Sequence, residues 1–174
     1  NAGHGTIGVP GYASWLKIGT FSGITYDGDS TSIMITIKAN TVPPAVYHAE
    51  ITIESNDTAN AEIVIPVTLT VPSNENSILT FSFPEQVAAA TINNNTHRVN
   101  IKVAQGTSLT DLVATFTLSE GATATANGIN QISGATANDF SSPLTYQITA
   151  ADSVHIQNWI VTVTVATAIE ETTK

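Results

Sequence analysis

Acidic side chains that could bind a metal ion stand close together in the segment YDGDS of this 174-residue chain. Asp27 and Asp29 could supply two oxygen ligands to calcium, because carboxylates on a loop suit a hard cation. The segment lacks the other ligands of an EF-hand loop, and Asp-Gly is also a common hairpin turn. We interpret the segment as a turn, and calcium binding stays the alternative.

A second polar run, SGATANDFSSPLTYQITAAD, covers residues 133–152. Asn138, Asp139 and Asp152 look like a set of oxygen ligands, but a strand of about eight residues, at roughly 3.3 Å each, is expected between the two acids. We therefore predict that Asp139 and Asp152 cannot share one ion. Asn138 and Asp139 should form a turn with residues 141–143, and Asp152 should open the next turn.

Catalytic and metal-ligating patterns are missing from the sequence. The four histidines are scattered, there is no cysteine, and no G-x-S-x-G segment is present. We expect no catalytic residue, no cofactor and no metal site, and no histidine with a carboxylate partner nearby. The chain is not expected to be an enzyme. The histidines are His4, His48, His97 and His155.

Aromatic side chains could stack on sugar rings, so each one is a candidate for contact with a glycan. Trp159, Tyr47 and Tyr146 are in phase with apolar rows, which predicts that they are core residues. Trp15 should lie in a core or pack against a preceding domain. Tyr12 and Tyr26 lie near expected loops and are the candidates for ligand contact.

Composition and charge exclude several classes of partner. Five Lys and Arg against fourteen Asp and Glu give a formal net charge of −9, which disfavours nucleic acid and anionic lipid surfaces. No stretch reaches the roughly 18 to 20 apolar residues that span a membrane. Because the chain opens without Met or an apolar leader, we expect a fragment or processed product.

Short strands with period-two alternation dominate the first half. In 46–54 the residues Tyr47, Ala49, Ile51 and Ile53 alternate with polar ones, which predicts a strand with one wet face. Segment 62–71 continues this pattern, and its Pro66 predicts an edge strand or a bulge. The inner rows expected for the neighbouring strands are Ile33, Ile35 and Ile37 in SIMITIKA, and Ile63, Ile65, Val67, Leu69 and Val71 in EIVIPVTLTV.

A polar stretch, PSNENS, separates two series of strands and predicts a linker at 73–77. We expect one β-sandwich over 1–72, whose first strands could belong to a preceding region, and a second over 78–174 with a polar tail. Strands are expected in ILTFSF, VAAATI, HRVNIKV, VATFTL, PLTYQIT and WIVTVTV. A single helical turn capped by Ser108 or Thr110 is expected in GTSLTDLVA.

Residues 14–71 resemble the immunoglobulin-like repeats that stand beside catalytic or adhesive domains in bacterial secreted proteins. The resemblance lies in ASWLKIG, FSGITYDGDSTSIMITIKA, VPPAVYHAEITIESND and IPVTLTV. Residues 78–165 resemble another immunoglobulin-like repeat, common in tandem on bacterial surface proteins, through ILTFSFP, GTSLTDLVATFTLSEGATA, QISGATANDFSSPLTYQITAAD and QNWIVTVTV. Residues 153–155 replace the family's glycine turn, which suggests a longer or differently shaped hairpin.

The resemblance implies an all-β protein of two tandem immunoglobulin-like β-sandwiches at the bacterial cell surface or outside the cell. We expect a non-catalytic spacer or presentation module that holds neighbouring domains of the same polypeptide. The alternative is an adhesion module that binds a surface glycan or protein through loops at one end of a sandwich. A third class is an accessory domain that completes a neighbouring enzyme's substrate cleft.

Overall fold

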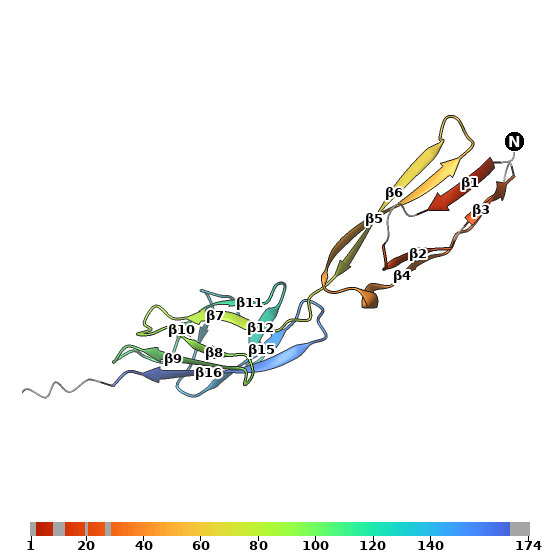
Figure 1. Ribbon diagram of the computed structural model, residues 1–174. Coiled ribbons are helices and arrows are strands. Elements are labelled where there is room, and N and C mark those ends of the chain that lie inside the picture. The colour runs from red at the N-terminus through yellow and green to blue at the C-terminus, as the bar shows by residue number, and fades with distance from the viewer. Residues whose placement is uncertain (1–2, 9–12, 20, 27–28, 168–174) are drawn as a thin grey trace, which may run out of the picture. The chain divides into compact units, whose positions relative to one another are not determined.

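The computed structural model describes residues 3–8, 13–19, 21–26 and 29–167. The chain divides into two compact units, Asn1–Val71 and Pro72–Lys174. Its described residues form strands joined by turns, with one short 3-10 helix at Ala39–Thr41 and no α-helix (Figure 1). No helix in these described ranges is long and apolar enough to cross a membrane. The all-β class expected from the sequence is therefore confirmed, while the immunoglobulin-like topology stays a prediction.

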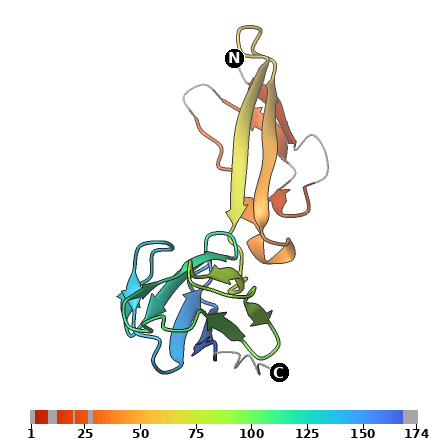
Figure 2. The ribbon, with the colours of Figure 1, turned by 90° about the vertical axis from the view of Figure 1, so that its left-hand side faces the viewer.

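Two antiparallel sheets build the first unit. The larger has the strand order β3-β1-β5-β6, and the smaller pairs β2 with β4. The long hairpin of β5 and β6 dominates this unit (Figure 2). The bounds are β1 Gly3–Gly8, β2 Leu16–Ile18, β3 Phe21–Thr25, β4 Ile35–Ile37, β5 Ala45–Ser55 and β6 Glu62–Val71.

The alternation predicted for β5 is confirmed. Ile51 is buried and Tyr47, Ala49 and Ile53 are half-buried, whereas the intervening His48 and its polar companions mostly face water. Strand β6 lies at the edge of its sheet, as its proline predicts. Pro66 has no backbone N–H to donate to a neighbouring strand, and an edge strand can accommodate this loss.

The inner rows expected for the strands beside β5 are only partly correct. Val67 and Leu69 of β6 pack against the core, but Ile63 and Ile65 of the same row are 48% and 43% exposed. Strand β4 covers only Ile35–Ile37, and both isoleucines are about half exposed. The fully buried core of this unit's described residues is small because the facing sheet has only two short strands. It consists of Trp15, Leu16 and Ile51.

The second unit has a six-stranded sheet with the order β13-β12-β15-β16-β9-β8 and two smaller strand pairs, β7 with β11 and β10 with β14. All its pairings are antiparallel except that of β16 with β9. The bounds are β7 Ile78–Ser82, β8 Thr91–Asn93, β9 Arg98–Val103, β10 Leu112–Val113, β11 Thr115–Leu118, β12 Thr123–Ala126, β13 Ile129–Asn130, β14 Ala137–Asn138, β15 Leu144–Thr149 and β16 Ile156–Val165.

A continuous core fills the second unit between its sheets. Trp159, Val161 and Val163 of β16 are buried beside the buried residues of β9, as their spacing predicts. The aromatic rings of Phe81 and Tyr146 meet edge-on in the same core. This arrangement buries far more apolar surface than the first unit does, so we expect the second unit to be the more stable body.

Two expectations for the second unit are corrected by the structure, and three of its strands were not expected. Of the segment VAAATI only Thr91 and Ile92 lie in a strand, β8. The helical turn expected near Ser108 and Thr110 is a non-helical loop in which the two hydroxyls are hydrogen-bonded at 2.8 Å. Strands β12 to β14 were not expected, because they are only two to four residues long and their Ala and Asn residues have weak strand propensity, so that pairing with neighbours makes them strands.

Candidate functional site

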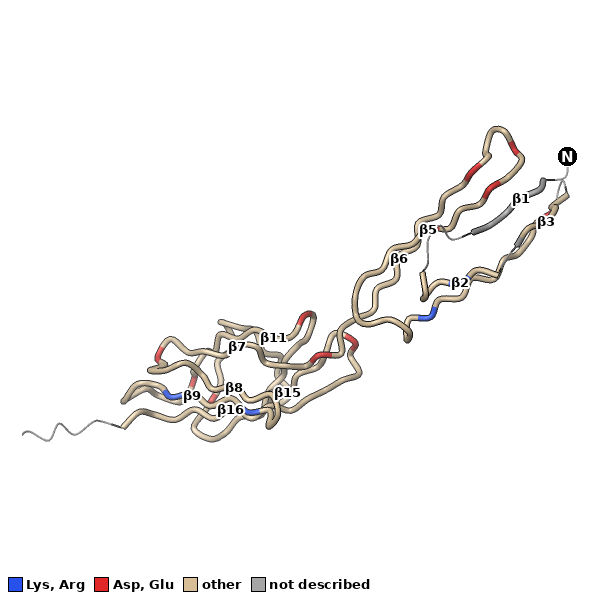
Figure 3. Tube along the Cα trace, in the orientation of Figure 1, with Lys and Arg blue, Asp and Glu red and all other residues tan. Residues whose placement is uncertain are grey.

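The acidic side chains do not form a metal centre in the part of the chain that the structure describes. No group of three or more His, Asp or Glu side chains that could hold a metal ion lies there. Acidic residues stand at the hairpin end of β5 and β6, where Glu54 pairs with Glu62 across the ladder (Figure 3). Asp57 closes this loop itself, because its carboxylate accepts hydrogen bonds from the Ala59 N–H and the Asn60 amide, and these bonds lower its pKa.

The turn expected at YDGDS is only partly described. The Asp29 N–H donates to the Tyr26 carbonyl at 3.0 Å, a bond that closes a four-residue turn. The hydroxyls of Thr25 and Thr31 meet at 2.8 Å across the same bend. Asp27 lies outside the described residues, so calcium binding by the pair stays the untested alternative to the turn.

Tyr26 is the exposed aromatic residue of the described part of the chain. Its side chain is 66% exposed, whereas the aromatic rings that were expected in the core are buried or half-buried. Trp159 and Tyr146 are buried, and Tyr47 is half-buried against buried Trp15. Tyr12, the other candidate for ligand contact, lies outside the described residues.

The polar run at 133–152 is divided between two turns and the protein interior. Asp139 accepts a hydrogen bond from the Ser141 N–H at 2.8 Å, and hydrogen bonds from the Ser141 side chain and backbone lower the pKa of its carboxyl group. Phe140 is buried, as predicted. Leu144, Tyr146 and Ile148 are also buried, as predicted for this strand. The run is thus a strand with turns at its ends.

Asn138 corrects the prediction that it belongs to the turn. It ends β14, and its amide donates to the Gln131 side-chain oxygen at 2.7 Å and to the Tyr146 hydroxyl at 3.3 Å. Gln131 and Tyr146 are buried, and burial raises the pKa of the Tyr146 phenol. Together, Gln131, Asn138 and Tyr146 form an interior polar trio that satisfies its own hydrogen bonds. Sequence reasoning missed it because Gln131 lies in no apolar row.

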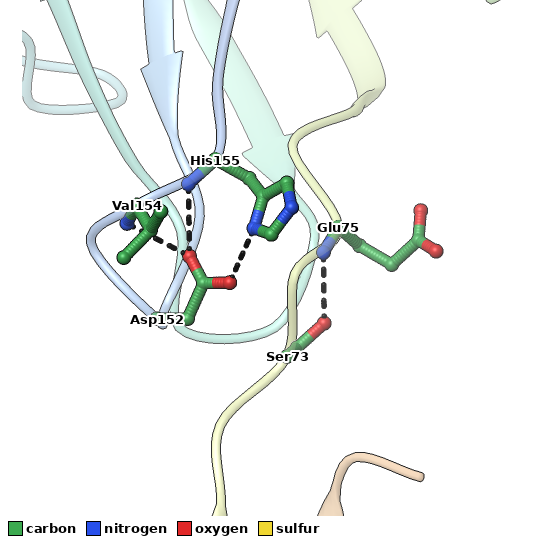
Figure 4. A network of polar contacts seen from close by, with 5 residues as sticks. All are labelled: Ser73, Glu75, Asp152, Val154 and His155. Atoms are coloured by element: carbon green, nitrogen blue, oxygen red, sulfur yellow. Dashed lines mark hydrogen bonds and ion pairs between the residues drawn. The ribbon is translucent and has the colours of Figure 1, made fainter. Parts of the chain in front are cut away.

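The hairpin turn at 150–155 contradicts the expectation that no histidine has a carboxylate partner. Asp152 Oδ1 accepts the N–H groups of Val154 and His155 at 2.9 and 3.0 Å, and Asp152 Oδ2 contacts His155 Nδ1 at 2.5 Å (Figure 4). The backbone N–H groups of His155 and Val154 are the main causes that lower the pKa of Asp152 to about 2. Ser153 has a φ of 61°, so this turn uses a left-handed backbone conformation at a residue other than glycine. The spacing Asp-x-x-His was the signal available in the sequence.

The polar stretch at 73–77 is hydrogen-bonded to the second unit. The Asp152 N–H donates to the Ser73 carbonyl and the Trp159 indole Nε1 to the Asn76 carbonyl, both at 3.0 Å. Ser77 and Ser119 exchange bonds, since the Ser119 N–H reaches the Ser77 carbonyl and the Ser77 N–H reaches the Ser119 Oγ, again at 3.0 Å. Figure 4 shows Ser73 and Glu75 beside the turn that contains Asp152 and His155. These bonds were not predicted.

Comparison with known proteins finds that the second unit is similar to a domain of surface proteins. Residues 78–163 match the protein family described as "SGBP, N-terminal", a match just short of half the chain. This family is associated with glycan binding at the surface of Bacteroidetes, and the match does not point specifically to immunoglobulin-like repeats. No curated protein matches the sequence.

Two solved structures are similar to parts of the chain. One is a "putative glycoside hydrolase" from Bacteroides thetaiotaomicron VPI-5482, with 35% identity over 57% of this chain and a TM-score of 0.46. The match covers 27% of that protein, so the chain spans about a quarter of its length. The other is a "putative secreted protein" from Bacteroides fragilis NCTC 9343, with 16% identity, 64% of this chain and 83% of that chain covered, and a TM-score of 0.38.

Proposed function

We propose that this chain is a non-catalytic spacer or presentation module of an exported bacterial surface protein that acts on glycans. The match of residues 78–163 to a surface-protein domain supports the location and the association with glycans. The module's work is geometric. It holds neighbouring domains of the same polypeptide at a distance from the cell surface, and its acidic surface keeps it soluble.

The burial of the aromatic side chains is the observation that carries this proposal. Protein sites for sugars present aromatic faces to the CH groups of the pyranose ring, which requires exposed rings. Within the described residues 72–167, every Phe, Tyr and Trp side chain is buried. The aromatic side chains of the second unit therefore stabilise its core. Such a body suits a load-bearing or positioning role better than recognition.

Glycan binding by the first unit is the second candidate, and Tyr26 favours it. A tyrosine that is 66% exposed beside a turn could stack on a sugar, and the neighbouring Asp29 carboxylate could accept hydroxyl hydrogen bonds. Tyr12 is the other residue proposed for such contact. Tyr26 has no ring partner in the described part of the chain, so we place this function second.

Affinity electrophoresis of the full chain through gels containing soluble plant and host polysaccharides tests the proposal. We expect the chain to migrate as it does in a gel without polysaccharide. Retardation that is lost in Tyr26→Ala or Tyr12→Ala and kept in the matched Tyr26→Phe variant would replace the spacer function with the binding function. Retardation unaffected by any of the three would also overturn the spacer proposal and place the contact elsewhere.

A further inference from the structure

The hairpin that joins β12 to β13 turns through the dipeptide Asn127-Gly128. Ala126 of β12 is paired with Ile129 of β13, so these two residues form the whole loop. Asn127 has a φ of 52° and Gly128 a φ of 77°. A two-residue hairpin loop with positive φ at both positions is the type I′ turn, which favours Asn-Gly. Both residues of the loop are exposed to solvent.

Asn-Gly is also a chemically reactive dipeptide. The backbone nitrogen that follows an asparagine can attack the Cγ of its side chain, and a glycine nitrogen approaches most easily because glycine has no Cβ. Asn127 is the only asparagine in the sequence that precedes a glycine. The dipeptide that gives the hairpin its tight turn is therefore the one in which this attack is least hindered.

Hydrogen bonds separate Asn127 from the other described asparagines that precede a small residue. The side-chain amide of Asn60, which precedes an alanine, is held by a carboxylate at 3.1 Å. The N–H of Ser77, which follows Asn76, is held by a hydroxyl at 3.0 Å. Among the residues that the structure describes, none is hydrogen-bonded to the Asn127 side chain or to the Gly128 N–H.

We propose that Asn127 is a site of spontaneous deamidation. Hydroxide removes the proton of the Gly128 N–H, and the nitrogen forms a bond to Asn127 Cγ. The bond from Cγ to Nδ2 then breaks and ammonia leaves, which closes a five-membered succinimide. Water opens this ring at either of its two carbonyl carbons and leaves aspartate or isoaspartate. One water is consumed and one ammonia released, with no change of oxidation state.

Strand β13 lets Asn127 leave the turn conformation so that the ring can close. The strand has only the two residues Ile129–Asn130, both exposed, and it forms one edge of the six-stranded sheet. It is paired with β12 at two positions. A short edge strand with exposed side chains opens locally at a small cost in free energy, while the rest of the unit stays folded.

The two products differ in their effect on the second unit. Aspartate keeps the backbone and adds a negative charge to an exposed turn. Isoaspartate leads the main chain through its Cβ, which lengthens a two-residue loop by one carbon and disturbs the tight turn. Directly after this turn, Ile129 pairs with Ala126, and the Gln131 N–H donates to the Ala124 carbonyl at 2.9 Å. Isoaspartate should therefore weaken the attachment of β13 and of the interior polar trio to which Gln131 belongs.

Peptide mapping by mass spectrometry, after incubation of the full chain in mildly alkaline buffer, tests the site. Deamidation exchanges an NH group for an oxygen atom, and we expect this mass gain in the peptide that contains Asn127. Asn60 and Asn76 are internal references and should keep their mass. In Gly128→Ala we expect loss of the product, because the added Cβ hinders the attack while meeting nothing within 4 Å in the folded hairpin.

The matched control is Gly106→Ala, which has a similar positive φ and open space around it but leaves the reactive dipeptide intact. It should deamidate at Asn127 as fast as the wild type. Thermal unfolding of the incubated wild type should show a fraction that melts at a lower temperature, and incubated Gly128→Ala should lack it. No mass gain at Asn127 in the time that converts the urea-unfolded chain would overturn the proposal. So would an equal rate in Gly128→Ala.

Discussion

The indole Nε1 of Trp159 donates a hydrogen bond of 3.0 Å to the backbone carbonyl of Asn76, 83 residues earlier in the chain. The bond ties the closing strand of the second unit to the segment before its first strand. Trp159 is buried and its ring meets His97 edge-on at 5.2 Å. One side chain thus serves both the core and the attachment of the connecting segment.

Replacing Trp159 with Phe keeps an aromatic ring in the core but leaves the Asn76 carbonyl without its donor. We expect the free energy of unfolding of the second unit to fall by at least about 1–3 kcal/mol, because a partly buried carbonyl loses its donor and the smaller ring packs less well in the core. Urea denaturation followed by far-UV circular dichroism measures it. Trp15→Phe, in the first unit, is the control and should leave the second unit's transition in place. An unchanged midpoint in Trp159→Phe would mean that the bond does not stabilise the unit.

Gly121 has a φ of 71°, and a Cβ added there would lie 2.8 Å from the Cβ of Ala151. Gly121→Ala therefore combines left-handed backbone strain with a clash against a side chain that cannot rotate away. The matched control is Gly106→Ala, at a φ of 81° with open space around it. We expect a loss of about 1 kcal/mol for Gly106→Ala from backbone strain. A loss larger by about 1–3 kcal/mol is expected for Gly121→Ala. Equal thermal shifts in the two variants would rule out the clash.

The interior polar trio should respond unequally to loss of its members. In Tyr146→Phe, Gln131 keeps its bond from the Asn138 amide, so we expect a cost of about 0.5–1.5 kcal/mol. In Asn138→Ala, Gln131 loses its closest donor and Tyr146 loses a partner, and a loss of about 1–3 kcal/mol is expected. Chemical denaturation ranks the two variants against Tyr26→Phe, an exposed control. The reverse ranking would show that the trio is not centred on Asn138.

Asp152 should make the stability of the second unit depend on pH. Its carboxyl pKa is lowered to about 2 by the bonds from the His155 and Val154 N–H groups, from a usual value of 3.8. A lowered pKa in the folded state means that the carboxylate stabilises the fold fully above the unfolded pKa, and that this contribution is lost as the pH falls from about 4 toward 2.

Asp152→Ala should accordingly have a lower melting temperature than the wild type at pH 7, and the difference should shrink between pH 4 and pH 2. Thermal unfolding of both proteins across this range measures the effect. Carbon-13 titration of the Asp152 side chain gives the pKa directly. A difference in melting temperature that stays constant down to pH 2 would show that the charge of Asp152 does not stabilise the turn.

Period-two alternation predicted the strands that have one wet and one dry face. Strands β5, β15 and β16 lie where their spacing placed them, and Trp159 and Tyr146 are core residues. Alternation failed where a strand has no facing partner. Ile35 and Ile63 belong to good apolar rows, but nothing among the described residues covers them, so both are about half exposed. A row of apolar residues predicts which face turns inward; it carries no information about what lies opposite.

The sequence by itself determined the all-β class, the acidic character and the change of pattern near Pro72, because these depend on composition and local periodicity. The tertiary structure decided which polar residues are interior. Asn138 and Asp139 are adjacent in the sequence, yet one bonds inside the core and the other closes a surface turn. It also decided that the stretch at 73–77 is anchored, since its bonds come from Ser119, Asp152 and Trp159, residues distant in the sequence that only folding brings near.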